Sequence, residues 1–215
     1  MPDVRKLHFS LIGGGANLNH IDVNSLSGFY AGTTEGGAVG TLWGGSVFVD
    51  IMPVQLPLLG SSMLSVGVVA DVTNAQLQFT GRCGGFPCTG TNGSVSETAV
   101  IGELNLAFPL GGGNVYNWYA GGGVVFKTPR GNPTGLGGPG ITGSDTAPAF
   151  RIGGTLMHNF TDNVAAGVKV GYQWAGSTNY DTTLPGERFH FGREGELIFA
   201  AVLTFSMPIA GAPPP

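Results

Sequence analysis

The sequence has few charged residues and no long apolar run. Charged residues make up 10% of the 215 residues, against about 25% in an average soluble domain. The net charge is −4, and Lys and Arg form no cluster that could neutralise phosphates, which excludes a nucleic-acid-binding surface. No apolar run reaches the ~18 residues that a transmembrane helix requires. Because a surface so poor in charge promotes self-association in water, we expect it to be covered or to face another solvent.

The chain also lacks the motifs of cofactor, metal and nucleotide sites. Glycine is abundant, with 39 residues, and forms three GGG triplets, but none of these opens a helix, so phosphate binding is unsupported. The apolar content of 42% excludes a disordered chain. We expect no cofactor, no metal site and no catalytic residues, and therefore no enzymatic activity.

Cysteine is rare, and its two copies lie close together. Cys83 and Cys88 flank the segment CGGFPC, which is not the CxxC spacing of redox enzymes. A zinc site would need further ligands, and no other His or Cys lies nearby in the sequence. We predict a small structural disulfide at a hairpin tip, with free thiols as the alternative. A disulfide would indicate an oxidising compartment.

Helical periodicity is almost absent, and alternation of apolar and polar residues recurs instead. It marks eight segments, at residues 5–15, 40–55, 62–80, 96–110, 115–128, 147–160, 164–176 and 188–207. An even number suits a closed up-and-down barrel with both termini on one side. In the third segment the alternation changes phase near Asn74, which predicts a β-bulge there.

The connections between these segments alternate in length. Three are short, at residues 57–61, 111–114 and 161–163, and four are long, at residues 16–39, 81–95, 130–145 and 177–187. Sorting of long loops to one side and tight turns to the other is typical of barrels in the outer membrane. The sequence therefore predicts an all-β fold: an eight-stranded antiparallel up-and-down transmembrane β-barrel with four long extracellular loops and three short periplasmic turns.

Each segment except the weakly marked first has one apolar face and one face with a few charges or amides. The charges lie mid-strand and have both signs: Asp50, Asp71, Glu103, Lys127, Arg151, Lys169, Glu194 and Glu196. A solvated outer face would carry many more charges, whereas a narrow lumen requires few and paired ones, because desolvation must be offset. We predict a lumen salt-bridge network that closes the barrel, with an ion pathway as the alternative.

Aromatic residues gather near the ends of the predicted strands rather than in their middle. Two interfacial girdles are expected from this distribution, since amphipathic rings favour the boundary between lipid and water. The predicted girdle residues are Trp43, Phe79, Phe108, Trp118, Phe126, Phe160, Tyr172, Trp174 and Phe205.

With these features the chain resembles the eight-stranded outer-membrane barrels of Gram-negative bacteria, the OmpA/OmpX-like class and its Gly-rich proteobacterial relatives. The phrases that carry the resemblance are GFYAG, NWYAGGGVVF, NVAAGVKVGYQW and the closing ELIFAAVLTF, which is similar to the assembly signal of such proteins. The resemblance covers residues 5–207 and implies a location in the bacterial outer membrane. We expect a mature chain without its signal peptide, with a cytosolic protein as the less favoured alternative. The resemblance also implies membrane lipid and lipopolysaccharide as partners.

The resemblance divides the chain into a barrel, residues 1–207, and a Pro-rich tail, residues 208–215. Such a tail is similar to the linker that joins OmpA-type barrels to a periplasmic peptidoglycan-binding domain. We therefore expect either peptidoglycan anchoring through a domain after residue 215 or a natural short tail.

The predicted function is structural: envelope integrity, with adhesion or recognition of surface or host ligands through the four long loops. A small-solute or ion pore is the first alternative, and a soluble lipocalin-like binder is a less favoured one. Some barrels of the class modify lipid A with a His/Ser pair on the outer wall. His8 and Ser10 have that spacing, but they fall on the predicted lumen face and no carboxylate or amide partner is evident nearby.

Overall fold

The computed structural model describes residues 5–34, 38–56, 60–90, 93–135 and 140–209. Among these residues, none belongs to a helix long and apolar enough to cross a membrane. Eight long strands form a closed barrel in the order β1-β15-β12-β11-β9-β8-β5-β4. They are β1 (Lys6–Leu18), β4 (Ala38–Leu56), β5 (Gly60–Leu77), β8 (Gly93–Gly111), β9 (Asn114–Arg130), β11 (Asp145–Asn159), β12 (Val164–Ala175) and β15 (Glu194–Pro208). All eight pairings are antiparallel, so the predicted up-and-down barrel is confirmed.

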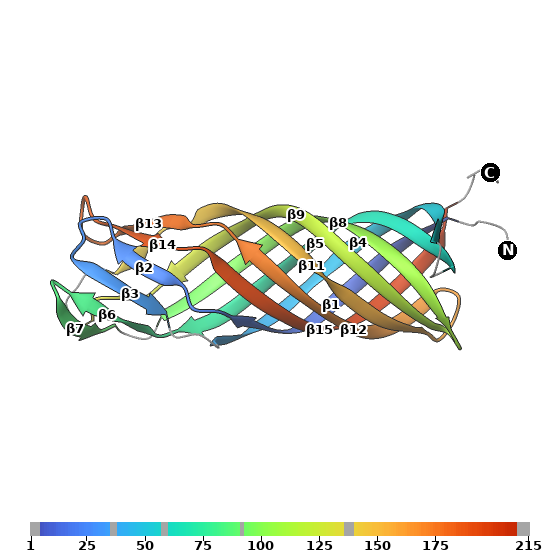
Figure 1. Ribbon diagram of the computed structural model, residues 1–215, viewed down its shortest axis with the longest axis horizontal. Helices are drawn as coiled ribbons and strands as arrows, with labels where there is room; N and C mark the ends of the chain where they lie inside the picture. Colours follow the sequence, from blue (N-terminus) through green and yellow to red (C-terminus); the bar gives the residue numbers. More distant parts are fainter. Residues whose placement is uncertain (1–4, 35–37, 57–59, 91–92, 136–139, 210–215) are drawn as a thin grey trace.

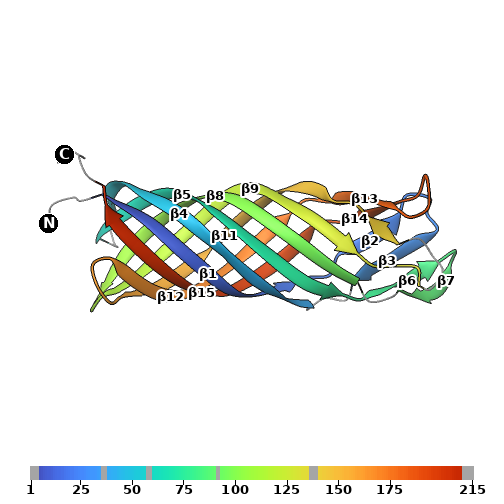
Figure 2. The same ribbon diagram turned by 180° about the vertical axis from the view of Figure 1, so that it is seen from behind.

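The barrel closes between its first and last strands. Lys6 pairs with Pro208, so β1 begins where β15 ends, at one end of the long axis. We call this the terminal end (Figure 1). The view from behind shows the same lattice of tilted strands, with the short strands gathered at the opposite, distal end (Figure 2).

The long connections, predicted as loops, contain regular β-strands. They contribute seven short strands to a second sheet, the distal sheet, in the order β10-β13-β14-β2-β3-β6-β7. These strands are β2 (Asp22–Ser25), β3 (Tyr30–Thr34), β6 (Phe79–Cys83), β7 (Phe86–Thr89), β10 (Ile141–Thr142), β13 (Thr178–Thr182) and β14 (Arg188–Phe191). The last predicted segment therefore covers two strands, β14 and β15.

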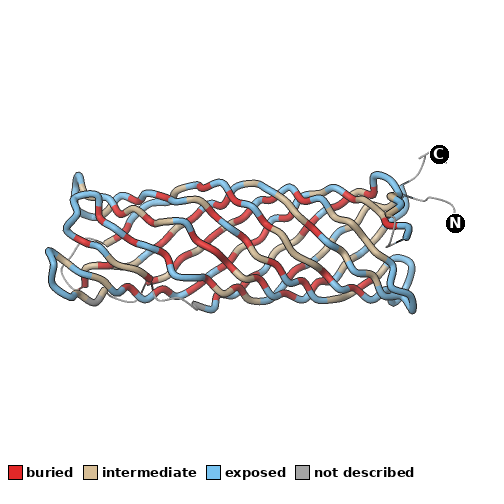
Figure 3. The backbone as a smooth tube through the Cα atoms, viewed as in Figure 1, coloured by how far each residue is buried: buried red, intermediate tan, exposed pale blue. Residues whose placement is uncertain are grey.

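The inside of the barrel changes character along its axis. Within the distal sheet it holds an apolar core of aromatic and aliphatic side chains, among them Tyr30, Phe79, Tyr180, Phe189 and Phe191. Toward the terminal end, the inward side chains include most of the buried charges of the described chain. Buried and exposed positions alternate along the strands, as expected where one face points inward (Figure 3).

The predicted bulge near Asn74 is wrong. Strand β5 pairs with β4 and β8 in unbroken register through Asn74, and its inward residues alternate regularly up to Leu77. What changes at Asn74 is the polarity of the two faces: Ala75 and Leu77 are buried, whereas Asn74 and Gln76 are exposed. The register shift between β4 and β5 lies instead at Asp50/Met52, so that Ile51 is the extra residue.

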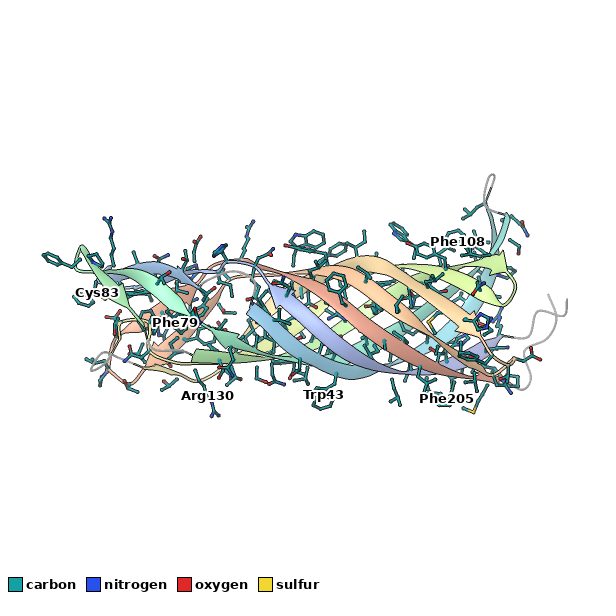
Figure 4. The ribbon with its side chains drawn as sticks, turned by 90° about the horizontal axis from the view of Figure 1, so that it is seen from below. Trp43, Phe79, Cys83, Phe108, Arg130 and Phe205 are labelled. Carbon is teal, nitrogen blue, oxygen red and sulfur yellow. A yellow bond between two sulfur atoms is a disulfide. The ribbon has the colours of Figure 1, made fainter. Side chains whose placement is uncertain are left out.

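Aromatic side chains on the outer wall lie at different positions along the long axis. Figure 4 shows Trp43 near the middle of the long axis, and Phe108 and Phe205 toward the terminal end. Exposed aromatic residues on the barrel strands and their turns are Phe9, Trp43, Tyr116, Trp118, Phe126, Phe150, Phe160, Trp174, Phe199 and Phe205. Phe108 and Tyr172 are half-buried.

Phe79 departs from the predicted girdle. Its side chain is 1% exposed and belongs to the apolar core of the distal sheet, where its ring packs edge-on against Phe191. The girdle prediction for Phe79 is therefore wrong. The residue lies beyond the point where the apolar face of β5 turns inward, so the rule that holds for the outer wall no longer applies to it.

Candidate functional site: the charged lumen of the barrel

All eight charged residues that the sequence predicts in the lumen are buried. Their exposed fractions lie between 1% for Arg151 and 6% for Asp50. They come from β4, β5, β8, β9, β11, β12 and β15, because the period of two places every second residue of a strand on the inner face. Their contacts divide them into three groups rather than one network.

The first group, the central cluster, is built around Arg151 on β11. Its guanidinium donates to both oxygens of Asp71 on β5: Nη1 lies 2.5 Å from Oδ2 and Nη2 lies 2.9 Å from Oδ1. Its Nε and Nη2 also donate to Oε1 of Gln173, at 3.1 and 2.6 Å. The fork geometry of the contact with Asp71 is the strongest form of a charge-assisted hydrogen bond. Arg151 is thereby fixed at one position inside the barrel.

Lys169 and Glu103 form the second ion pair of the central cluster. The Lys169 Nζ lies 3.3 and 3.2 Å from the two carboxylate oxygens of Glu103. It also lies 4.1 Å from the ring centroid of Tyr119, a cation–π arrangement. Glu103 Oε1 is 3.8 Å from Arg151 Nη1, which joins the two pairs.

Glu196 completes the central cluster through polar rather than charged partners. Gln173 Nε2 donates to Glu196 Oε2 at 2.9 Å, and the Thr73 hydroxyl donates to Oε1 at 2.8 Å. Gln173 thus accepts from Arg151 and donates to Glu196, and it connects groups that do not touch directly. The prediction of charged residues alone missed Gln173, Thr73 and Tyr119 as members of this cluster.

The second group, the distal cluster, lies where the lumen meets the apolar core. Lys127 donates to Glu194, and its Nζ is 3.9 Å from Oε1 of Glu97. Both Glu97 carboxylate oxygens are buried and accept no hydrogen bond from the described residues. The sequence prediction missed Glu97, although its separation of six residues from Glu103 on β8 places it on the same inner face.

Glycines on neighbouring strands make room for these side chains. Gly121 faces Glu103 across the β8–β9 pair, and a Cβ added there would lie 2.8 Å from the Glu103 Cγ. Gly153 and Gly171 lie against the Tyr119 hydroxyl in the same way. The hydroxyl donates to the Val170 carbonyl oxygen at 3.2 Å. Part of the glycine content therefore accommodates large inward side chains.

The third group contains Asp50 and lies at the terminal end. Its carboxylate contacts His8, Ser65 and the backbone N–H of Lys6. No hydrogen bond or ion pair among the described residues connects Asp50 to the central cluster. Asp50 is therefore separate from the cluster around Arg151.

The distal sheet contains the two cysteines and two tyrosines with perturbed pKa values. The predicted disulfide between Cys83 and Cys88 is present and closes the β6–β7 hairpin, with a Cα–Cα distance of 5.8 Å. Burial raises the pKa of the Tyr30 phenol to about 12, and burial likewise raises the pKa of Tyr180. The Tyr30 hydroxyl has no hydrogen-bond partner among the described residues. Across all residues that the structure describes, no three His, Cys, Asp or Glu side chains are arranged to hold a metal ion.

No protein-family model and no curated protein matches the chain. Solved structures match it across nearly its full length. The outer membrane protein OprG from Pseudomonas aeruginosa has a TM-score of 0.54 at 11% identity, covering 94% of this chain and 96% of its own. A major outer membrane protein from Thermus thermophilus has a TM-score of 0.52 at 14% identity, covering 94% and 99%. The outer membrane protease OmpT from Escherichia coli has a TM-score of 0.51 at 10% identity, covering 96% and 98%. These likenesses show the fold, which is that of outer-membrane β-barrels.

Proposed function

We propose that this chain, which has the fold of outer-membrane β-barrels, is a bacterial outer-membrane protein with a structural and surface-interaction role. It contributes to envelope integrity and presents its distal sheet outside the cell for adhesion or recognition. Its lumen is closed. The observation that carries the proposal is the set of buried ion pairs that cross the barrel interior.

The outer wall supports placement in a membrane. Many outward side chains of the barrel strands are large and apolar, for example Val68, Leu104 and Val168. A water-soluble barrel has the opposite arrangement, with its apolar face inside. The distal sheet has that soluble arrangement, so it suits a position beyond the lipid. The terminal end then faces the periplasm.

Closure of the lumen follows from which strands the ion pairs connect. Arg151 and Asp71 lie on β11 and β5, which are separated in the ring by β9 and β8. The pairs of Lys169 with Glu103 and of Lys127 with Glu194 also each have two strands between them. Such contacts cross the lumen rather than follow its wall. They support a closed barrel over the alternative of a small-solute or ion pore.

The distal sheet is the proposed interaction surface. Its strands β2, β3, β6, β7, β10 and β13 lie in or overlap the segments predicted as partner-binding loops, residues 16–39, 81–95, 130–145 and 177–187. The disulfide limits movement of the β6–β7 hairpin, so this part of the surface is held in shape before a partner binds. Pre-ordering lowers the entropic cost of binding. Surface or host ligands and lipopolysaccharide are the proposed partners.

Peptidoglycan anchoring is proposed only for a chain in which a domain follows residue 215. Residues 210–215 of the predicted Pro-rich tail lie outside the described residues. To test this part of the proposal, the complete gene product is expressed and its co-sedimentation with purified peptidoglycan is measured. Equal sedimentation of the complete product and of a barrel ending at Met207 would contradict it.

Adhesion tests the surface role. A Gram-negative host without adhesins is given either the wild-type chain or a variant in which residues 79–89 are replaced by a short turn. Both proteins should reach the outer membrane and show the heat-dependent gel shift of a folded barrel. The wild type should increase adherence to an epithelial cell layer, and the variant should lose most of that increase. Equal adherence of wild-type, variant and empty-vector cells would contradict the proposal.

A further inference from the structure

A hydrogen-bonded chain of three side chains lies at the terminal end of the lumen. The Ser206 hydroxyl on β15 is 2.8 Å from Nδ1 of His8 on β1. The Nε2 of the same imidazole is 3.0 Å from Oδ1 of Asp50 on β4. The three strands are neighbours in the barrel, so a hydroxyl, an imidazole and a carboxylate are held in series by the sheet. This is the arrangement in which a serine is activated as a nucleophile.

The carboxylate at the end of this chain is held by other groups. The Ser65 hydroxyl donates to Asp50 Oδ1 at 2.8 Å, and the backbone N–H of Lys6 donates to Oδ2 at 3.1 Å. The register shift at Ile51 directly follows Asp50. Bulges often re-aim a side chain next to a functional site. Asp50 is therefore oriented toward His8 by the sheet itself, and its side chain is only 8% exposed.

The hydrogen bonds define the role of each atom. An ionised Asp50 only accepts hydrogen bonds, so it favours the His8 tautomer with the proton on Nε2. Nδ1 is then free to accept the proton of the Ser206 hydroxyl. Relative to the serine proteases the two ring nitrogens exchange roles, but either nitrogen can act as the base when the other donates to a carboxylate. His8 would be the general base and Asp50 its positioning residue.

Two of the three side chains, His8 and Ser206, are partly exposed. The His8 side chain is 25% exposed and Ser206 is half-buried, whereas the central cluster deeper in the barrel is almost fully buried. Lys6 lies two residues before His8 on the same face of β1. Its Nζ donates to the Asp162 carbonyl oxygen at 2.6 Å, in the turn before β12. Since β15 lies between β1 and β12, the Lys6 side chain extends across the strand that carries Ser206.

We propose that the terminal mouth of the barrel is a serine-hydrolase-type site for small carboxylic esters, with Ser206 as nucleophile and His8 as general base. The Ser206 Oγ attacks the acyl carbon and His8 Nδ1 takes its proton. The ester C–O bond breaks, and the leaving alkoxide takes that proton from His8. Water then hydrolyses the acyl-Ser206 ester with the same base, which releases the carboxylic acid and restores the serine. The Lys6 ammonium would stabilise the oxyanion of both tetrahedral intermediates.

This inference goes beyond the surface role and is independent of it. It also assigns His8 a partner set that the sequence did not indicate: the sequence favoured Ser10 and found no carboxylate. In the structure Ser10 pairs with Thr204 instead, at 2.8 Å. A failure of the ester chemistry would leave the closed lumen and the distal sheet unaffected, and the reverse holds as well.

The test uses refolded full-length chain that shows the heat-dependent gel shift. We measure hydrolysis of p-nitrophenyl butyrate and labelling by a biotinylated fluorophosphonate, with the labelled residue identified by mass spectrometry. The expected result is label on Ser206 and turnover above the empty-detergent rate. Ser206→Ala and His8→Phe should each reduce turnover and labelling at least ~100-fold, whereas Ser10→Ala should leave both unchanged.

A positioning role for Asp50 has its own readout. Asp50→Asn should lower kcat at least ~100-fold with little change in KM, and it should shift the acid limb of the kcat/KM profile against pH. Lys6→Met should lower kcat, and Lys6→Arg should restore part of it. Absence of label on Ser206 in a folded barrel, or label that persists unchanged in His8→Phe, would overturn the proposal. Unchanged turnover in Ser206→Ala would overturn it too.

Discussion

Replacement of Arg151 by alanine tests the energetics of the central cluster most sharply. The substitution removes the two hydrogen bonds to Asp71 and the two to Gln173. Asp71 remains as a carboxylate whose side chain is 4% exposed. Breaking a buried pair in this way typically costs ~3–5 kcal/mol, since a charge remains without its partner. We expect Arg151→Ala to lower the free energy of unfolding by about that amount.

The assay is urea unfolding of the barrel in lipid vesicles, followed by tryptophan fluorescence and by the gel shift. The double variant Arg151→Met with Asp71→Leu should recover much of the loss, because replacing both members of a buried pair by apolar residues is often nearly neutral. The matched control is Arg188→Ala, which breaks an exposed pair with Asp181 and should cost less than ~1 kcal/mol. A loss for Arg151→Ala no larger than that of the control would refute the reasoning.

The other predictions concern separate parts of the fold. Tyr30→Phe removes a buried hydroxyl without a described partner, so the free energy of unfolding should stay equal or rise. Its raised folded-state pKa, about 12, means that this group's contribution is complete below the unfolded pKa near ~10 and is lost as the pH rises toward 12. Unfolding titrations from about pH 9 to 12 should show that loss in the wild type and less of it in Tyr30→Phe; identical curves would contradict it. Gly171→Ala should cost ~1–3 kcal/mol in the same assay, because its Cβ meets the Tyr119 hydroxyl; an unchanged midpoint would contradict this. Reduction of the Cys83–Cys88 disulfide should destabilise the distal sheet by about 2 kcal/mol, seen as faster amide exchange in β6 and β7 with the barrel unaffected; uniform acceleration would contradict it.

The barrel could be predicted from the sequence because one physical rule governs each strand. Strand period fixes which side chains share a face, and in barrels of the outer membrane the outward face is largely apolar. Arg151 and Lys169 could therefore be placed on the inner face from the sequence alone. The alternating connection lengths then indicated the up-and-down order.

The distal sheet was not predicted because the polarity of the inner and outer faces is reversed there. At Asn74 the outer face of β5 becomes polar and the inner face becomes apolar, while the facing of the side chains continues without a break. In the sequence this looks like a shift of phase. It suggested a bulge at Asn74 and placed Phe79 on the outer wall.

Partners across the lumen depend on the tilt of the strands and on which strands lie opposite each other. Those quantities belong to the closed ring, not to any one segment. Sequence could place Asp50 inside but could not show that it contacts His8 rather than a cation. The register shift at Ile51 directly follows Asp50. Its only signal in the sequence is a pair of adjacent apolar residues, Ile51 and Met52.

Conductance in planar lipid bilayers tests the central claim, that the chain is a membrane barrel closed by ion pairs across its lumen. Purified wild-type protein that shows the heat-dependent gel shift is inserted at neutral pH, and current is recorded at both polarities. We expect current at the level of the protein-free bilayer at both polarities. Reproducible single-channel steps from the wild type would contradict the closed lumen.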